Sequence, residues 1–261
     1  MQTYSKYSRP DAVLLIPIIL LGFALRLYKL GAQSLWYDET VSAFLAGQPV
    51  TDIIAHTARD IHPPGYYLLL HVWQIPTGSS EFALAFFSLI FGVLLIPLIF
   101  LLARHLINRQ VAYWAAWLVA VSPFNIWYSQ EVRMYTLGAA LGVIAAYCAL
   151  RALQSRTAHW FWLGYLLAAA IGLYTLYYFA FLLIAINAIF LFFVLYPKIN
   201  RSALEPLLVT NILLLLAYLP WLPTAWRQAT NPPVPPWRSP PALWPVVVES
   251  WSALALGQSI G

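Results

Sequence analysis

Long apolar runs recur along the chain, and they limit what it can fold into. A helix needs about 20 apolar residues to cross a hydrocarbon layer of ~30 Å, and such runs follow one another from residue 11 to residue 222. Only 9% of the 261 residues are charged and 62% are hydrophobic, whereas a soluble domain carries about 25% charged residues. The sequence therefore predicts an all-α integral membrane protein with several spans.

Seven of these runs are candidate spans in one transmembrane domain that covers residues 1–261. They lie at 11–28, 82–106, 111–128, 132–150, 160–178, 179–196 and 207–222. Ser122-Pro123 interrupts the third run, where the proline is expected to bend or end the helix. The fifth and sixth runs join without a polar break, and the aromatic residues around Tyr174–Phe179 favour an interfacial turn between them.

The distribution of Lys and Arg predicts the orientation. With the N-terminus in the cytoplasm, every inner segment carries a basic pair: Lys6, Arg9, Arg104, Arg109, Arg151, Arg156, Lys198 and Arg201. The positive-inside rule favours this arrangement. Seven of the nine acidic residues then fall on the outer side. We therefore expect a multi-pass protein of the plasma or inner membrane whose polar chemistry is extracytoplasmic.

Two outer segments are too long or too rich in proline to be simple turns. The first outer loop, residues 29–80, is expected to form short amphipathic helices on the membrane surface, interrupted at His62-Pro63-Pro64-Gly65. Nine of the 19 prolines lie between Pro220 and Pro245, which predicts an outer loop at 223–245. Because the chain stops without a closing element, we expect it to be incomplete at the C-terminus.

The first outer loop begins with an acidic pair among aromatic residues, Trp36-Tyr37-Asp38-Glu39. One interpretation is a helix cap, with acids favourable in the first turn of a helix that begins near Thr40. The other is catalytic: a carboxylate that takes a proton from an attacking hydroxyl or holds a divalent cation. Trp36 and Tyr37 suit either a sugar face or a membrane interface.

Basic and polar residues elsewhere on the outer side could bind an anion. Arg133 suits a clamp on phosphate because its planar guanidinium makes paired hydrogen bonds, and the predicted phosphate-binding set is Arg133, His62 and Lys29. Arg133 could equally snorkel towards the headgroups, and His62 could be only a solvated loop residue. Asp52, His56 and Asp60 share a helical stripe, which we interpret as a wet face, with Asp60 close to the His-Pro-Pro turn.

Some classes of function are disfavoured by what the sequence lacks. It contains no glycine-rich phosphate loop or dinucleotide fingerprint, and no ionisable residue lies at the middle of a proposed span, which argues against a pump or ion-coupled carrier. An outward-facing site without a nucleotide motif favours a substrate that arrives in the bilayer as a lipid-linked phosphate.

Three motifs occur in an order that resembles one family. They are Leu25–Glu39 (LRLYKLGAQSLWYDE), His62–Leu69 (HPPGYYLL) and Ser122–Tyr135 (SPFNIWYSQEVRMY). Together they resemble glycosyltransferase family 39, the dolichyl-phosphate-mannose–protein mannosyltransferase-like proteins of bacteria, whose fold is called GT-C. Members of this family usually run well beyond the length of this chain.

The resemblance implies a polyprenyl-phosphate sugar donor, inverting transfer and an essential outer-loop aspartate, here Asp38. It also implies a divalent metal ion (Mg, Mn or Zn) near the site, with Asp38 and Asp60 as its candidate ligands. Supporting roles fall on Asp60, Glu131 and Tyr135, and Glu39 is grouped with Asp38 as catalytic.

We therefore expect a membrane glycosyltransferase that moves a sugar from a polyprenyl-phosphate donor to a protein, lipid or glycan acceptor outside the cytoplasm. The alternatives are a carrier or flippase of lipid-linked sugars and a non-catalytic membrane subunit. No nucleic-acid partner is expected, because the basic residues follow the pattern of topology signals.

Overall fold

The computed structural model describes residues 9–154, 158–195, 204–233 and 242–256, and every regular element in them is helical. The predicted all-α fold is therefore confirmed. In chain order the helices are α1 (Arg9–Leu27), α2 (Tyr37–Ala46), α3 (Val50–Thr57), α4 (Gly65–Thr77), α5 (Glu81–Leu106), α6 (Arg109–Val121), α7 (Pro123–Gln130), α8 (Tyr135–Gln154), α9 (Ala158–Thr175), α10 (Phe179–Leu195), α11 (Leu204–Tyr218), α12 (Leu222–Thr230) and α13 (Leu243–Leu256).

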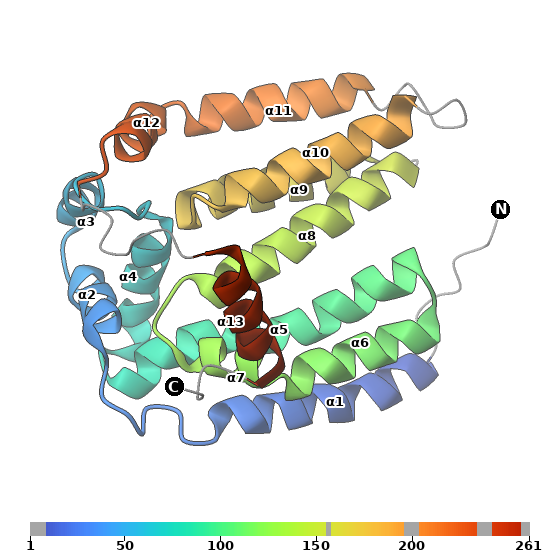
Figure 1. Ribbon diagram of the computed structural model, residues 1–261, viewed down its shortest axis with the longest axis horizontal. Helices are drawn as coiled ribbons and strands as arrows, with labels where there is room; N and C mark the ends of the chain where they lie inside the picture. Colours follow the sequence, from blue (N-terminus) through green and yellow to red (C-terminus); the bar gives the residue numbers. More distant parts are fainter. Residues whose placement is uncertain (1–8, 155–157, 196–203, 234–241, 257–261) are drawn as a thin grey trace.

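The long helices run roughly side by side, and the short helices α2, α3, α4 and α12 gather at one end of the bundle (Figure 1). Helix α5 packs against α1, α6, α7 and α8, and α8 packs against α9. The contact face of α8 is lined by small residues, among them Ala145, Ala149 and Ala152. Small side chains let helix backbones approach closely, which is how apolar helices associate without a hydrophobic driving force.

Two described helices, α5 and α8, are long and apolar enough to cross a membrane, and α11 with α12 would make a third if the 77° bend between them lies within one span. Shorter apolar helices cover Val13–Leu27 and Phe179–Phe192. The predicted runs coincide with helices, apart from 111–128, which is divided into α6 and α7 at Ser122. The count of seven spans stays a prediction.

Arg26 joins the pieces of this divided run. Pro123 has no N–H to donate, so carbonyls at the end of α6 are left without helical partners. The fully buried guanidinium of Arg26 donates to the carbonyls of Val119 (2.8 Å) and Ala120 (2.9 Å) and to Ser129 Oγ in α7 (3.1 Å). Arg26 thus has a structural role.

The outer loop predicted at 223–245 contains a helix in its first part, because α12 occupies Leu222–Thr230, and its location outside the membrane stays a prediction. Proline in the first turn of a helix costs no hydrogen bond, since the first N–H groups have no intrahelical acceptor. Pro223 occupies such a position. Residues 234–241 lie outside the described part, and α13 begins at Leu243.

Candidate functional site

The acidic pair lies in the first turn of α2. This helix begins at Tyr37, three residues before the start expected near Thr40. Glu39 is 7% exposed, and both of its carboxylate oxygens accept backbone hydrogen bonds. Oε2 accepts from Trp36 N (3.2 Å), which caps the helix, and Oε1 accepts from Val132 N (2.7 Å). Glu39 therefore fastens α2 to the segment between α7 and α8.

Arg133, next to Val132, faces the other member of the pair. Its side chain is buried, and its guanidinium lies 3.7 Å from Asp38 Oδ2 and donates to the Asp38 carbonyl at 3.3 Å. The Asp38 side chain remains 38% exposed. Because Glu39 holds α2 against Val132, it also sets the position of Asp38 relative to Arg133.

His62 and Asp60 continue the same chain of interactions. Arg133 Nη2 lies 3.3 Å from His62 Nε2, and His62 Nδ1 lies 3.6 Å from Asp60 Oδ2. A guanidinium only donates hydrogen bonds, so Nε2 accepts and the proton resides on Nδ1, facing Asp60. Burial raises the pKa of Asp60, but the hydrogen bonds with the His62 side chain and the Ile61 backbone outweigh it and leave the pKa below its ordinary value.

The turn that contains His62 leads directly into helix α4. Pro63 and Pro64 are buried, and α4 starts directly after them. A side chain at Gly65 would place its Cβ 2.5 Å from the carbonyl oxygen of Tyr174, so this helix start can approach α9 only with glycine there. The HPPG sequence thus fixes where His62 lies.

Tyr67, which the sequence analysis did not single out, belongs to the same group. It is fully buried, and among the described residues its hydroxyl has no hydrogen-bond partner, as is true of Arg133 Nε. Burial raises the pKa of Tyr67 to about 12, opposed by the positive charge of Arg133 and reinforced by the carboxylates of Asp60 and Asp38. The available signal was the tyrosine pair directly after HPPG.

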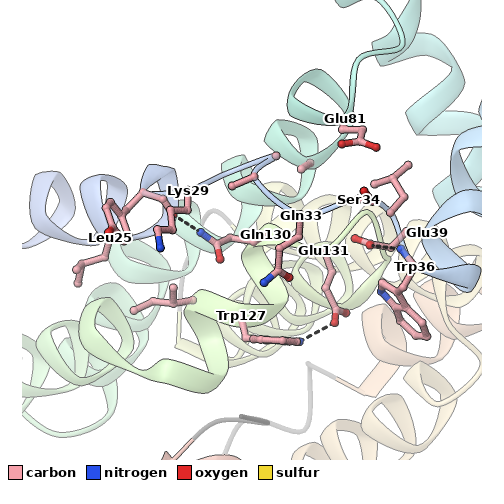
Figure 2. Close-up of a pocket in the computed structure, with 16 residues that line it drawn as sticks. Leu25, Lys29, Gln33, Ser34, Trp36, Glu39, Glu81, Trp127, Gln130 and Glu131 are labelled. Atoms are coloured by element: carbon pink, nitrogen blue, oxygen red, sulfur yellow. Dashed lines mark hydrogen bonds between the residues drawn. The ribbon is translucent and has the colours of Figure 1, made fainter.

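Of the three remaining predicted residues, Tyr135 lies beside this group. The guanidinium of Arg133 stands 5.8 Å from the ring centre of Tyr135, in the range of a cation–π contact. Lys29 and Glu131 instead line a separate pocket with Glu39 (Figure 2). The structure therefore brings together Asp38, Asp60, His62, Tyr67 and Arg133, and it places Lys29 and Glu131 elsewhere.

The candidate metal ligands Asp38 and Asp60 do not form a metal centre with their neighbours. In the described ranges no group of three or more His, Cys, Asp or Glu residues could hold a metal ion. Asp38 is instead paired with Arg133, and Asp60 with His62. A guanidinium beside Asp38 repels a divalent cation, so this donor set does not fit one and we derive no step through a metal.

Helix α12 holds the turn that contains Asp60. Gln228 of α12 donates through Nε2 to the carbonyls of Thr57 (2.8 Å), Ala58 (3.2 Å) and Asp60. Its own carbonyl accepts from the Tyr177 hydroxyl, which in turn accepts from Trp221 Nε1 (2.9 Å). The turn before HPPG is thus fixed by a residue 168 to 171 positions away in the sequence.

Comparisons with solved structures identify the fold. The S. cerevisiae protein O-mannosyltransferase Pmt1–Pmt2 complex bound to its sugar donor matches 87% of this chain at 16% identity, with a TM-score of 0.67. The archaeal oligosaccharyltransferase AglB from Archaeoglobus fulgidus, in complex with an inhibitory peptide and a dolichol-phosphate, matches 97% at 17% identity, with a TM-score of 0.66. This chain spans 35% of each of those chains. The expected GT-C fold is confirmed.

The family comparison rests on sequence. No curated protein matches this chain, but the model of the dolichyl-phosphate-mannose-protein mannosyltransferase family (PMT_2) matches residues 61–223. This range contains His62, Tyr67 and Arg133, whereas Asp38 and Asp60 precede it. Because the match covers more than half of the chain, this integral membrane protein belongs to the dolichyl-phosphate-mannose-protein mannosyltransferase family.

Proposed function

We propose that this chain carries the catalytic site of a membrane glycosyltransferase that moves a sugar from a polyprenyl phosphate to an acceptor on the extracytoplasmic side. The observation that carries the proposal is the placement of Arg133, whose guanidinium lies between Asp38 and His62. A base for the acceptor and a cation for the departing phosphate then stand next to each other. The family match and the fold support this assignment.

In the proposed reaction an acceptor hydroxyl oxygen attacks C1 of the donor sugar as the bond from C1 to the phosphate oxygen breaks. The hydroxyl proton passes to Asp38, whose side chain is partly exposed, and polyprenyl phosphate leaves with the bonding electron pair. Attack opposite to the leaving group inverts C1. A base held in this way contributes roughly 10²–10⁴ to the rate.

The other residues act on the leaving group and on the position of Asp38. Arg133 stabilises the negative charge on the departing phosphate, and Tyr67 and Arg133 Nε supply donors that lack partners among the described residues. His62 contacts the guanidinium of Arg133, and Asp60 contacts His62, so these two residues help to fix the position of Arg133. Glu39 is a positioning residue in this scheme, since its carboxylate is occupied by two backbone N–H groups.

Substitution of Asp38 tests the proposal. We expect Asp38→Asn to lower sugar transfer from a radiolabelled polyprenyl-phosphate sugar by at least about 100-fold in a membrane assay. Asp52→Asn is the matched control, because Asp52 is an exposed carboxylate on α3 in the same loop, and it should retain activity. Transfer by Asp38→Asn at the rate of the unmodified protein would refute the role of Asp38.

The same membrane preparation distinguishes a transferase from the alternative, a carrier of lipid-linked sugars. Movement of the lipid-linked sugar across vesicle membranes without any glycosylated product would identify a flippase. The charged group at one end of the bundle favours transfer, because its carboxylate, guanidinium and imidazole are in direct contact with one another rather than distributed along a path.

A further inference from the structure

A cavity with both polar and apolar lining residues lies beside the proposed catalytic group. Its volume is about 520 Å³, within the range of sites for small molecules. It is formed by the end of α1, the connection that follows, the start of α5, and α7 (Figure 2). Asp38, Asp60, His62 and Arg133 are not among its lining residues, so it is distinct from the catalytic group.

Glu131 is the most unusual group in this cavity. Its Oε1 accepts a hydrogen bond from Trp127 Nε1 at 2.7 Å, whereas Oε2 is buried and has no partner within the described part of the chain. Buried polar atoms are nearly always hydrogen-bonded, and leaving one unpaired costs roughly 1–3 kcal/mol. An unpaired acceptor beside a cavity points to a ligand that donates a hydrogen bond.

The charges of the lining exclude one class of ligand. The carboxylates of Glu39 and Glu81 outnumber the one ammonium group of Lys29. A phosphate or carboxylate ligand would be repelled by this lining. A neutral ligand rich in hydroxyl groups meets no such penalty, and a hydroxyl can pair with Glu131 Oε2 in either protonation state of that carboxyl group.

Two tryptophans provide the apolar surface that such a ligand needs. Trp36 is 47% exposed and Trp127 is 37% exposed, and Figure 2 shows both near the Glu131 carboxylate, with Gln33 beside them. The face of an indole ring carries partial negative charge, so it packs against the C–H groups of a sugar ring while the hydroxyls reach Glu131 and Gln33.

We propose that this pocket binds a neutral sugar unit of a glycan acceptor. The proposal rests on the proposed function, because it names the acceptor of that same reaction. Asp38 and Glu39 are adjacent in α2, and Glu39 lines the pocket while Asp38 faces Arg133. A sugar in the pocket therefore lies against Glu39, the chain neighbour of the base that would activate the hydroxyl of the acceptor.

Saturation-transfer NMR on the purified protein tests the binding directly. The detergent must lack a sugar headgroup, and the probes are the methyl glycosides of mannose, glucose and galactose, with methyl phosphate as the charged comparison. We expect saturation transfer to at least one glycoside, and no signal from methyl phosphate that Trp127→Ala removes. Trp127→Ala should weaken glycoside binding about five- to tenfold, the range expected for one aromatic contact.

Trp226→Ala is the matched control, since Trp226 is an exposed tryptophan of α12 outside the pocket, and it should bind as the unmodified protein does. Glu131→Ala should weaken binding as Trp127→Ala does, whereas equal binding by all variants would overturn the site. A methyl phosphate signal that is lost in Trp127→Ala, in place of a glycoside signal, would overturn the ligand class.

A further measurement separates the acceptor from the donor. Added polyprenyl-phosphate sugar should leave glycoside binding unchanged, and displacement of the glycoside would overturn the assignment to the acceptor. Asp38→Asn should bind glycosides normally, because no chemistry is needed. An active Asp38→Asn that still binds glycosides would refute the proposed function alone, and loss of binding in the pocket variants with no change in transfer would refute this inference alone.

Discussion

Tyr66 and Tyr67 are neighbours in sequence, both fully buried, and differ in their hydrogen bonds. Ser88 Oγ donates to the carbonyl of Arg133 at 3.2 Å, so its lone pair accepts from the Tyr66 hydroxyl, also at 3.2 Å. The hydroxyl of Tyr67 has no partner in the ranges that the structure describes. One hydroxyl therefore serves the fold, and the other is available to a ligand.

This difference predicts opposite effects for the two phenylalanine variants. Tyr66→Phe loses a buried hydrogen bond worth about 1 kcal/mol, and its thermal midpoint in detergent should fall by about 2–4 °C. Tyr67→Phe should keep its midpoint, yet its transfer rate should fall roughly 10- to 100-fold, because a hydrogen bond to a charged phosphate contributes about 1.5–3 kcal/mol. A lowered midpoint with full activity in Tyr67→Phe would assign Tyr67 to the fold.

Glu131 predicts a dependence of stability on pH. Burial, opposed by the hydrogen bond from Trp127, raises the pKa of Glu131 from 4.5 to about 7. The folded protein then binds this proton more tightly than the unfolded chain, so the contribution of Glu131 to stability falls as the pH rises from 4.5 to about 7. Thermal midpoints measured at pH 5 and pH 8 should differ less in Glu131→Gln than in the unmodified protein.

Glu131→Gln keeps an oxygen that accepts from Trp127 Nε1 and removes only the titration. Glu81→Gln is the control, because Glu81 also lines the pocket but is exposed. It should retain the pH difference of the unmodified protein. An unchanged pH difference in Glu131→Gln would show that Glu131 is ionised in the folded protein at ordinary cost.

The acidic pair shows what the sequence could reveal at this scale. Two acids in the first turn of a helix are a recognisable cap, and the resemblance pointed to Asp38. Local sequence could not assign the cap to Glu39, because the second partner of Glu39, Val132 N, lies 93 residues away. Tyr67 escaped notice for the same reason, since only the fold brings Arg133 to it.

Among the elements, α12 was hidden by its composition. A count of prolines argues against a spanning helix, and it does not reveal that Pro223 lies in the first turn of a helix, where proline is tolerated. The interaction that matters is also non-local, since Gln228 reaches the carbonyls of Thr57 and Ala58. The sequence could predict a helical stripe over Asp52–Asp60 and a break at HPPG, but not that α3 ends at Thr57 or that α12 holds the turn that follows it.

Removal of the Gln228 amide should loosen that turn. In Gln228→Ala we expect the amides of Arg59 and Asp60, which close the turn on His56 and Thr57, to exchange hydrogen about five- to tenfold faster, as the loss of roughly one net hydrogen bond allows. Sugar transfer should fall as well, because Asp60 supports His62.

Gln48→Ala is the control for this change, because Gln48 is half-buried and its amide donates to Phe44 O, within α2 and the turn after it. It should leave exchange at Arg59 and Asp60 unchanged. Exchange in Gln228→Ala that matches the control would show that α12 lies beside the turn without holding it.

For the whole molecule, fold class was predictable because each apolar run must form a helix in a bilayer. Helix ends were less predictable: the run at 111–128 becomes two helices, and Arg26 satisfies the carbonyls freed at the break. The bundle also separates the end that carries α2, α3, α4 and α12 from the end near the α5–α6 connection (Figure 1). Which end faces outward is predicted only by the basic residues.

Cysteine labelling tests that orientation. The chain has one cysteine, Cys148, so Cys148→Ala gives a background without thiols. Thr51→Cys and Gln110→Cys then place single thiols at two exposed positions, one in α3 and one at the start of α6. If the N-terminus is cytoplasmic, as the positive-inside rule predicts, a membrane-impermeant maleimide added to intact spheroplasts should label Thr51→Cys fully. Gln110→Cys should react only after the membrane is opened, and labelling in the reverse order would place the proposed catalytic group in the cytoplasm.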